Sequence, residues 1–198
     1  MSTPGSTLRE ALHDHSFWWL YLVTLTCGPT MFIPFAHVSA SARDIGVSDA
    51  QAVGLVGMIG VGSLVGRFMI GALADRLGRQ RTLVLMLASM AASYLAWLVA
   101  GGYPMLAVFA LWFGLSYGGI VSMLPALCMD LFGARAVAGI IGTLYSGAAL
   151  GNLLGPVLAG AAFDRFGSYR PVMLACTVLM AVALWAATML SRSTRPRH

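Results

Sequence analysis

The 198-residue sequence contains no lysine, few charged residues and only three cysteines. Charged residues make up 10% of the chain and hydrophobic residues 59%. A typical soluble domain has about 25% charged residues. With so few charges, and a mean hydropathy of +0.82, the chain cannot cover its own surface with polar groups. This shortage argues against a water-soluble domain and favours a chain surrounded by lipid.

Several chemical motifs are also missing. The sequence has no glycine-rich phosphate loop and no cluster at metal-ligand spacing, so we expect no ATP-driven mechanism, no metal and no cofactor. Cys27, Cys128 and Cys176 lie in or beside apolar runs, where cysteine packs as a small hydrophobic residue. Residues 1–16 are polar and lack the apolar core and cleavage site of a signal peptide, so we expect none.

Long apolar runs are abundant. A helix that crosses a bilayer needs about 20 apolar residues. Six stretches meet this length: residues 17–38, 50–74, 82–100, 104–128, 136–162 and 171–190. The runs lack the alternation of barrel strands. The sequence therefore predicts an all-α membrane protein. It would have a cytoplasmic N-terminal segment over 1–16, a six-helix bundle over 17–190 and a basic cytoplasmic tail over 191–198.

The arginines predict the orientation of this bundle. The net charge of +5 comes from arginines in short connecting segments, which fits membrane orientation better than nucleic-acid binding. Cytoplasmic loops carry an excess of basic residues. Eight loop arginines fall on the side of both termini: Arg9, Arg76, Arg79, Arg81, Arg135, Arg192, Arg195 and Arg197. Three fall on the other side: Arg43, Arg165 and Arg170. We therefore expect both termini in the cytoplasm of a cell whose plasma or inner membrane holds the chain.

Two connecting segments resemble each other. Residues 71–81 read GALADRLGRQR and residues 160–170 read GAAFDRFGSYR, with glycine, aspartate, arginine, glycine and arginine at identical spacing. Three predicted spans separate the copies, which places them on opposite membrane faces. This pattern indicates an inverted repeat of three plus three helices, as occurs within each half of some transporter folds. The alternative is that an ordinary Asp-Arg-x-Gly turn occurs twice.

The first copy, with Gly71, Asp75, Arg76, Gly78 and Arg79, resembles the signature loop of the major facilitator superfamily. The runs FWWLYLVTLTCGPTMFIPFAHVSASARDIGVS and GLVGMIGVGSLVGRFMIGALADRLGR resemble the C-terminal half of its monocarboxylate-transporter and oxalate/formate-antiporter branch. The resemblance covers the whole chain, six helices of a usual twelve. It implies a symporter or antiporter in which this loop is a conformational latch. The partner of Asp75 would then lie in a second half.

The residues of this loop have clear local roles. We expect Gly71 to permit close approach of another helix and Gly78 to allow a tight reversal of the chain. Asp75 and Arg76 should end the helix at the edge of the bilayer. The carboxylate of Asp75 could pair with the nearby arginines or meet the N-terminus of a neighbouring helix.

Arg67 is the only charged residue well inside a predicted span. It lies roughly 12 Å along the helix from Asp75, at a depth where an ionised group usually faces a cavity or a partner. Gly60, Ser63 and Gly71 share its face, so bulk is absent where a ligand would need room. A guanidinium binds a carboxylate through two hydrogen bonds. The alternative is a structural arginine, paired with helix-end carbonyls or with a carboxylate of another half.

The resemblance adds to this interpretation. In the monocarboxylate-transporter branch, an arginine in the equivalent helix binds the substrate carboxylate, and Arg67 matches it. The aspartate that this family often has four residues earlier is Ser63 here. The resemblance therefore does not imply proton coupling through that aspartate in this chain. The lysine of the oxalate antiporters corresponds to Ala148, so the sequence favours a monoanion.

The fifth predicted span has two distinct faces. One carries glycines at every fourth position, Gly147, Gly151 and Gly155, which favours close packing against another helix. Tyr145 and Asn152 lie about 120° away around the helix. At membrane depth Asn152 needs a partner or water, so it either bonds to another helix or lines the pathway. With Arg67 and Ser63, these two residues complete the candidate substrate site.

Other functions remain compatible with the sequence. A drug or sugar carrier of the same superfamily would not need Arg67. An intramembrane serine hydrolase would need a histidine to activate Ser146, but His37 is the only histidine inside a predicted span and has no acid placed beside it. We therefore expect a transporter half and not an enzyme. Its partners would be a small organic anion, membrane lipid, and a second six-helix half or a second copy of the chain.

Overall fold

The computed structural model describes residues 5–193 and is almost wholly helical over that range. Its helices are α1 (Leu8–His13), α2 (His15–Asp44), α3 (Asp49–Leu77), α4 (Arg79–Leu98), α5 (Tyr103–Phe132), α6 (Val137–Phe166) and α7 (Arg170–Ser193). Within this range six helices, α2 to α7, are long and apolar enough to cross a membrane, which confirms the predicted number of spans. The tail arginines Arg195 and Arg197 lie outside the described residues.

Several helices continue past the ends of the predicted spans. The predicted connection over residues 75–81 is helical except at Gly78, which alone separates α3 from α4. Gly78 has φ +86°, so the reversal predicted there is confirmed. The spans were predicted too short because a helix does not stop where apolar residues stop. Its polar ends can extend into water with the backbone hydrogen bonds intact.

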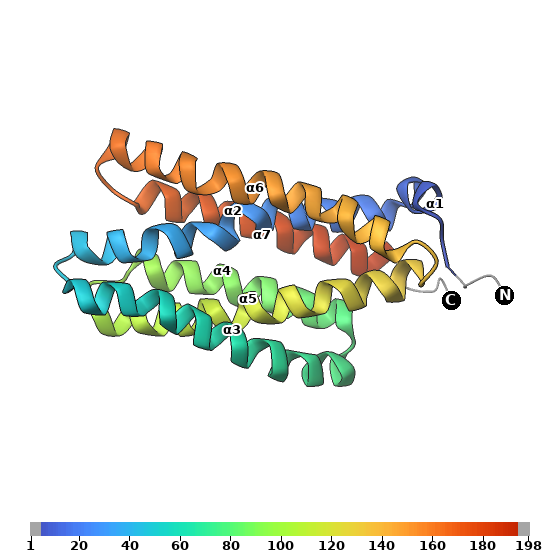
Figure 1. Cartoon of the computed structure of the whole chain (residues 1–198), viewed down its shortest axis with the longest axis horizontal. Helices are drawn as coiled ribbons and strands as arrows, with labels where there is room; N and C mark the ends of the chain where they lie inside the picture. The colour runs from blue at the N-terminus through green and yellow to red at the C-terminus, as the bar shows by residue number, and fades with distance from the viewer. Residues whose placement is uncertain (1–4, 194–198) are drawn as a thin grey trace.

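The packing of the helices follows the inverted repeat. Helix α3 packs most extensively on α5, and α6 packs on α2, while α4 contacts α5 and α7 contacts α2. Exchanging α2–α4 with α5–α7 converts each of these contacts into its counterpart. The α2–α3, α4–α5 and α6–α7 turns lie at one end of the bundle, and the α3–α4 and α5–α6 turns lie at the other (Figure 1). The inverted repeat read from the two similar segments is therefore confirmed in the fold.

Glycines hold the two equivalent helix pairs together. A Cβ atom added at Gly66 of α3 would lie 2.1 Å from the carbonyl oxygen of Leu115 in α5. A Cβ atom added at Gly151 of α6 would lie 2.3 Å from the Cδ atom of Pro29 in α2. At the spacing of the repeat, Gly66 corresponds to Gly155, which also packs against Pro29. The predicted glycine face of α6 is thus confirmed as a contact with α2.

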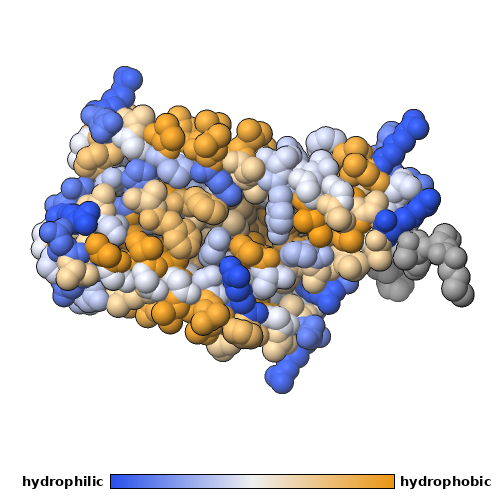
Figure 2. Space-filling model, in the orientation of Figure 1, coloured by the Kyte–Doolittle hydropathy of each residue, from blue (hydrophilic) through white to orange (hydrophobic). Residues whose placement is uncertain are grey.

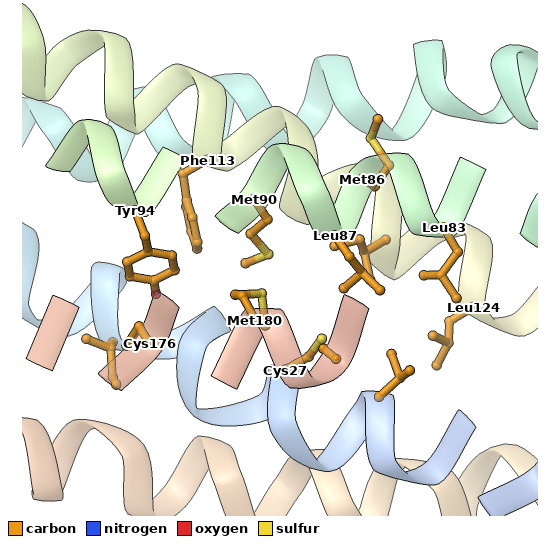
Figure 3. Close-up of a cluster of buried hydrophobic side chains, with 14 of the residues drawn as sticks. Cys27, Leu83, Met86, Leu87, Met90, Tyr94, Phe113, Leu124, Cys176 and Met180 are labelled. Atoms are coloured by element: carbon orange, nitrogen blue, oxygen red, sulfur yellow. The ribbon is translucent and has the colours of Figure 1, made fainter. Parts of the chain in front are cut away.

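The core lies between α4 and its neighbours. Figure 3 shows the side chains of Met90, Tyr94, Phe113 and Met180 gathered in this region. The fully buried hydroxyl of Tyr94 donates a hydrogen bond to the carbonyl of Thr30, so the core links α4 to α2. All three cysteines are buried and unpaired within the described residues, in agreement with a packing role.

Helix α1 was missed by the sequence analysis, which treated residues 1–16 only as a polar segment. Thr7 and Glu10 form a reciprocal capping box at its start. The backbone N–H of Thr7 donates to the Glu10 carboxylate, and this bond lowers the pKa of that carboxyl group. The backbone N–H of Ser6 also donates to the carbonyl of Phe132, 2.7 Å away. The segment is therefore tied to the end of the bundle that holds the α5–α6 turn.

The surface separates into polar ends and an apolar middle. Figure 2 shows hydrophilic side chains concentrated at the two ends of the molecule, with only a few interrupting the apolar face between them. Of the six long helices, α3 and α6 are the least buried. Their large exposed apolar side chains include Val61, Leu64, Phe68 and Met69 on α3, and Leu153, Leu154, Val157 and Leu158 on α6. These faces need lipid or a second helical bundle to cover them.

Candidate functional site

Two hollows lie among α2, α3, α5 and α6, and they share one residue, Tyr117. The first, called here the apolar hollow, has a volume of about 370 Å³ and lies among α2, α5 and α6. Its walls are Val23, Thr24, Cys27, Met31, Phe32, Tyr117, Ile120, Val121, Leu124, Tyr145, Ala148, Ala149 and Asn152. The second, called here the arginine hollow, has a volume of about 350 Å³ and is lined by Phe35, Gly60, Ser63, Leu64, Arg67 and Tyr117.

Arg67 lies at the arginine hollow without a partner. Its side chain is exposed, and it forms no hydrogen bond or ion pair with any residue in the range 5–193. The structure therefore does not support a structural pair with helix-end carbonyls of this half. Gly60 and Ser63 line the same hollow, as their shared helix face predicted. An unpaired guanidinium beside small residues can accept an anionic ligand or a carboxylate from another half.

Gly71 does not behave as predicted within this chain. It does not line the arginine hollow, and a Cβ atom added there would meet nothing within 4 Å in the described structure. The prediction of a close helix contact at Gly71 is therefore wrong for this bundle. Helix α3 has turned its glycine contact face, which includes Gly62 and Gly66, toward α5, and Gly71 lies off that face.

Tyr117 was missed by the sequence analysis. Its ring stacks on Phe113 with centroids 6.3 Å apart, and it meets Phe35 edge to face at 5.4 Å. Its hydroxyl forms no hydrogen bond to a described residue. A tyrosine in the middle of a span was the available signal, because its polar tip needs a partner at membrane depth.

Asn152 and Tyr145 line the apolar hollow, whereas Arg67 and Ser63 line the arginine hollow, so the four predicted site residues are divided between the two hollows. With its nitrogen turned toward α2, the Asn152 amide donates to the carbonyl oxygens of Gly28 (2.7 Å) and Ala148 (3.2 Å). The first alternative for Asn152, a hydrogen bond to another helix, is therefore present, and the same side chain lines the apolar hollow. The hydroxyl of Tyr145 forms no hydrogen bond within the described range.

The first copy of the repeated loop forms an ion pair, but this pair does not include Asp75. Asp75 and Arg76 are exposed and have no polar partner among the described residues. Arg79 pairs instead with Asp130 at the end of α5, and it also donates to the carbonyl of Ala126 at 3.3 Å. Of the two alternatives for Asp75, the pair with neighbouring arginines is absent from the described part of this bundle. The helix carries those arginines away from Asp75, and the end of α5 supplies the nearer carboxylate.

The second copy of the loop is tied into the bundle. His37 of α2 donates from Nε2 to the carbonyl of Pro156 in α6, at 2.9 Å. Nδ1 lies 3.1 Å from the Tyr169 hydroxyl, and it accepts from that hydroxyl in the tautomer that carries its proton on Nε2. Tyr169 also stacks on Phe163 at 4.4 Å. Burial raises the pKa of Tyr169, with smaller contributions from Asp44 and Asp164.

These contacts also bear on the hydrolase alternative. Both ring nitrogens of His37 are engaged by Tyr169 and Pro156, and the Ser146 hydroxyl donates to the carbonyl of Thr143 at 2.7 Å. Ser146 and His37 therefore form no nucleophile–base pair.

Comparisons with known proteins agree with this fold. The MFS-type transporter opdF of Penicillium oxalicum is 32% identical over 160 residues, which cover 80% of this chain and 38% of that protein. Monocarboxylate transporter 3 of Rattus norvegicus is 32% identical over 196 residues, covering 92% of this chain and 40% of that protein. The crystal structure of the E. coli fucose:proton symporter FucP is similar in fold, with a TM-score of 0.75 at 16% identity. That match covers 92% of this chain and 44% of FucP.

The matched part of the chain thus covers 24% to 40% of the length of these and other curated relatives. Its residues 18–198, which include all six long helices apart from the first turn of α2, match the Major Facilitator Superfamily profile. This match and the paired three-helix units lead to one conclusion: the chain belongs to the Major Facilitator Superfamily.

Proposed function

We propose that this chain is a six-helix half of a secondary transporter that moves a small organic anion, a monocarboxylate, by alternating access. The observation that carries the proposal is Arg67, an unpaired guanidinium at a hollow of about 350 Å³ inside a span. Holding an ionised group at that depth costs about 2.5–3.5 kcal/mol on insertion scales. A carboxylate ligand that neutralises it offsets this cost. The similarity to monocarboxylate transporter 3 supports the same substrate class.

The loop of Gly71, Asp75, Arg76, Gly78 and Arg79 is proposed as the conformational latch. Asp75 and Arg76 are exposed and unpaired in the described structure, so both are available to a second six-helix unit. Arg79 is held by Asp130 and keeps the loop attached to α5.

The partner is proposed to be a second six-helix half or a second copy of this chain. The exposed apolar faces of α3 and α6 support this, because they flank the two hollows and need cover. We expect the isolated chain either to form a homodimer or to be unstable and inactive. Transport by a purified, reconstituted monomer would contradict this expectation.

The chain is proposed to cross the plasma or inner membrane with both termini in the cytoplasm. Eight arginines on one side against three on the other support this orientation. Reporter fusions at positions 45 and 103 should report an outside location, and fusions at 78 and 198 an inside location. A C-terminus found outside would overturn the orientation.

Arg67 variants test the substrate site. Binding of labelled monocarboxylates and thermal stability should be measured on the same membranes, which contain the assembled carrier. Arg67→Lys keeps the charge but removes the planar fork, so affinity should fall by about tenfold or more while stability is retained. Arg67→Ala should abolish binding. Arg135→Ala, in the exposed α5–α6 turn, is the matched control and should bind normally.

Two outcomes would contradict the proposal. Unchanged carboxylate affinity in a folded Arg67→Ala protein would remove the reason for choosing a monocarboxylate and favour a drug or sugar carrier. A loss of thermal stability without a change in affinity would assign Arg67 to a structural pair with another subunit.

A further inference from the structure

The polar groups that line the apolar hollow are mostly engaged already. The Thr24 hydroxyl lies 2.9 Å from the carbonyl oxygen of Tyr21 and 3.0 Å from that of Leu144. The Asn152 amide nitrogen donates to the carbonyls of Gly28 and Ala148. The hydroxyls of Tyr145 and Tyr117 on these walls are without a partner in the described range. A ligand part in this hollow therefore has few groups to bond with and should be apolar.

The arginine hollow has the opposite character. Ser63, Arg67 and Tyr117 each carry a polar group that forms no hydrogen bond to any residue the structure describes. A guanidinium and two hydroxyls are donors suited to one carboxylate. The polar end of a ligand should therefore lie here.

Tyr117 connects the two regions. It lines both hollows, so they adjoin at its side chain. Its ring is fixed between Phe35 and Phe113, which leaves little freedom to turn away. Together the hollows have the character of a ligand site with predominantly apolar walls and a few placed polar groups.

The structure assigns a substrate class to this site, an inference that rests on the proposed function. The substrate is a monocarboxylate with an extended alkyl or aryl body. Its carboxylate binds Arg67 and the Tyr117 hydroxyl, and its body fills the apolar hollow. A two-carbon or three-carbon acid would leave that hollow empty. A polyhydroxylated acid would bury hydroxyls that find no partner.

The test uses photoaffinity labelling of the full chain in membranes, which detects weak binding. The probe is an octanoate derivative with a diazirine at the end distant from the carboxylate, and its neutral amide is the control probe. Acetate, butyrate, hexanoate and octanoate compete with the label. Their affinities should rise by up to about fourfold per added methylene, the factor expected for burying each group. Gluconate should compete at least about tenfold more weakly than hexanoate.

Variants separate the two parts of the site. Ala149→Phe places a ring in the apolar hollow and should flatten the rise in affinity with chain length. Val178→Phe adds the same ring at an exposed position on α7 that lines neither hollow, and should keep the rise. Tyr117→Phe should weaken all the acids by a similar factor, about tenfold, because a hydrogen bond to a charged group is lost. Tyr103→Phe, at the start of α5, should leave them unchanged.

The outcomes distinguish this inference from the proposed function. Two results would overturn the apolar-bodied substrate alone, provided that competition still depends on Arg67. One is equal affinity for acetate, butyrate, hexanoate and octanoate, and the other is equal affinity for gluconate and hexanoate. An unaltered rise in affinity with chain length in Ala149→Phe also overturns the apolar-bodied substrate alone. A lipid chain that permanently fills the apolar hollow would have the same consequence. Equal labelling by the acid and its amide, unaffected by Arg67→Ala, overturns both proposals.

Discussion

The two three-helix units, α2–α4 and α5–α7, share a scaffold but carry different chemistry. At the spacing of the repeat, Gly62 and Gly66 of α3 correspond to Gly151 and Gly155 of α6, and all four pack closely against the neighbouring unit. The residues beside these glycines differ. Ser63 corresponds to Asn152, and Arg67 corresponds to Pro156.

The polar groups beside the glycines differ in whether they have hydrogen-bond partners. On α6, the Asn152 amide is bonded to the α2 backbone and the Pro156 carbonyl is bonded to His37. On α3, Ser63 and Arg67 keep their polar groups free of other described residues. Close packing constrains the small residues in both copies, whereas polar positions beside them can serve either structure or ligand binding.

The largest expected effect concerns the shared scaffold. Gly66→Ala and Gly155→Ala should both destabilise the bundle. The new Cβ atoms would lie 2.1 Å from the Leu115 carbonyl oxygen and 2.7 Å from the Cα atom of Pro29, respectively. Overpacking typically costs about 1–3 kcal/mol, and contact with backbone favours the upper end for Gly66→Ala.

Thermal unfolding of the purified variants measures this effect. Gly57→Ala is the control on α3, because a Cβ atom there meets nothing within 4 Å, and it should be neutral or slightly stabilising. If one glycine tolerates alanine and its counterpart does not, the two units do not share a packing scaffold.

A smaller effect should separate the two loops. His37→Ala removes the hydrogen bonds to Tyr169 and Pro156, which tie the second loop and α6 to α2. It should lower the free energy of unfolding by about 2 kcal/mol, since each bond has a net value of about 1 kcal/mol. Tyr169→Phe removes one of them and should cost about 0.5–1.5 kcal/mol. Chemical denaturation in detergent can measure both. Ser146→Ala, which loses only a bond within its own helix, is the control. Wild-type stability in His37→Ala would mean that the second loop is no more firmly held than the first.

The smallest effect on stability is expected at the equivalent aspartates. Asp75 and Asp164 both lie in the last turn of a helix, where a negative charge is unfavourable by about 0.3–1 kcal/mol. Asp75→Asn and Asp164→Asn should therefore be neutral or slightly stabilising. In the assembled carrier, Asp75→Asn should slow uptake of labelled monocarboxylate with little change in affinity, and Asp164→Asn should not. A large affinity loss with normal turnover in Asp75→Asn would place Asp75 in the substrate site instead.

The sequence by itself determined the six spans, the inverted repeat and the position of Arg67 inside a span. Those features depend on local properties: the length of apolar runs, matched residue spacing and a charge inside a span. The glycine face of α6 could also be predicted from the sequence, because helical periodicity alone places Gly147, Gly151 and Gly155 on one side of the helix.

Only the tertiary structure decided which polar groups are engaged. Asn152 meets Gly28, His37 meets Tyr169 and Arg79 meets Asp130 across more than 45 residues of sequence in each case. Tyr117 became a candidate only when α2, α3, α5 and α6 were assembled around it. Periodicity gives the face of a helix on which a residue lies, but not the partner opposite that face. The partner depends on how distant helices pack, and that packing leaves Arg67 free while it engages Asn152.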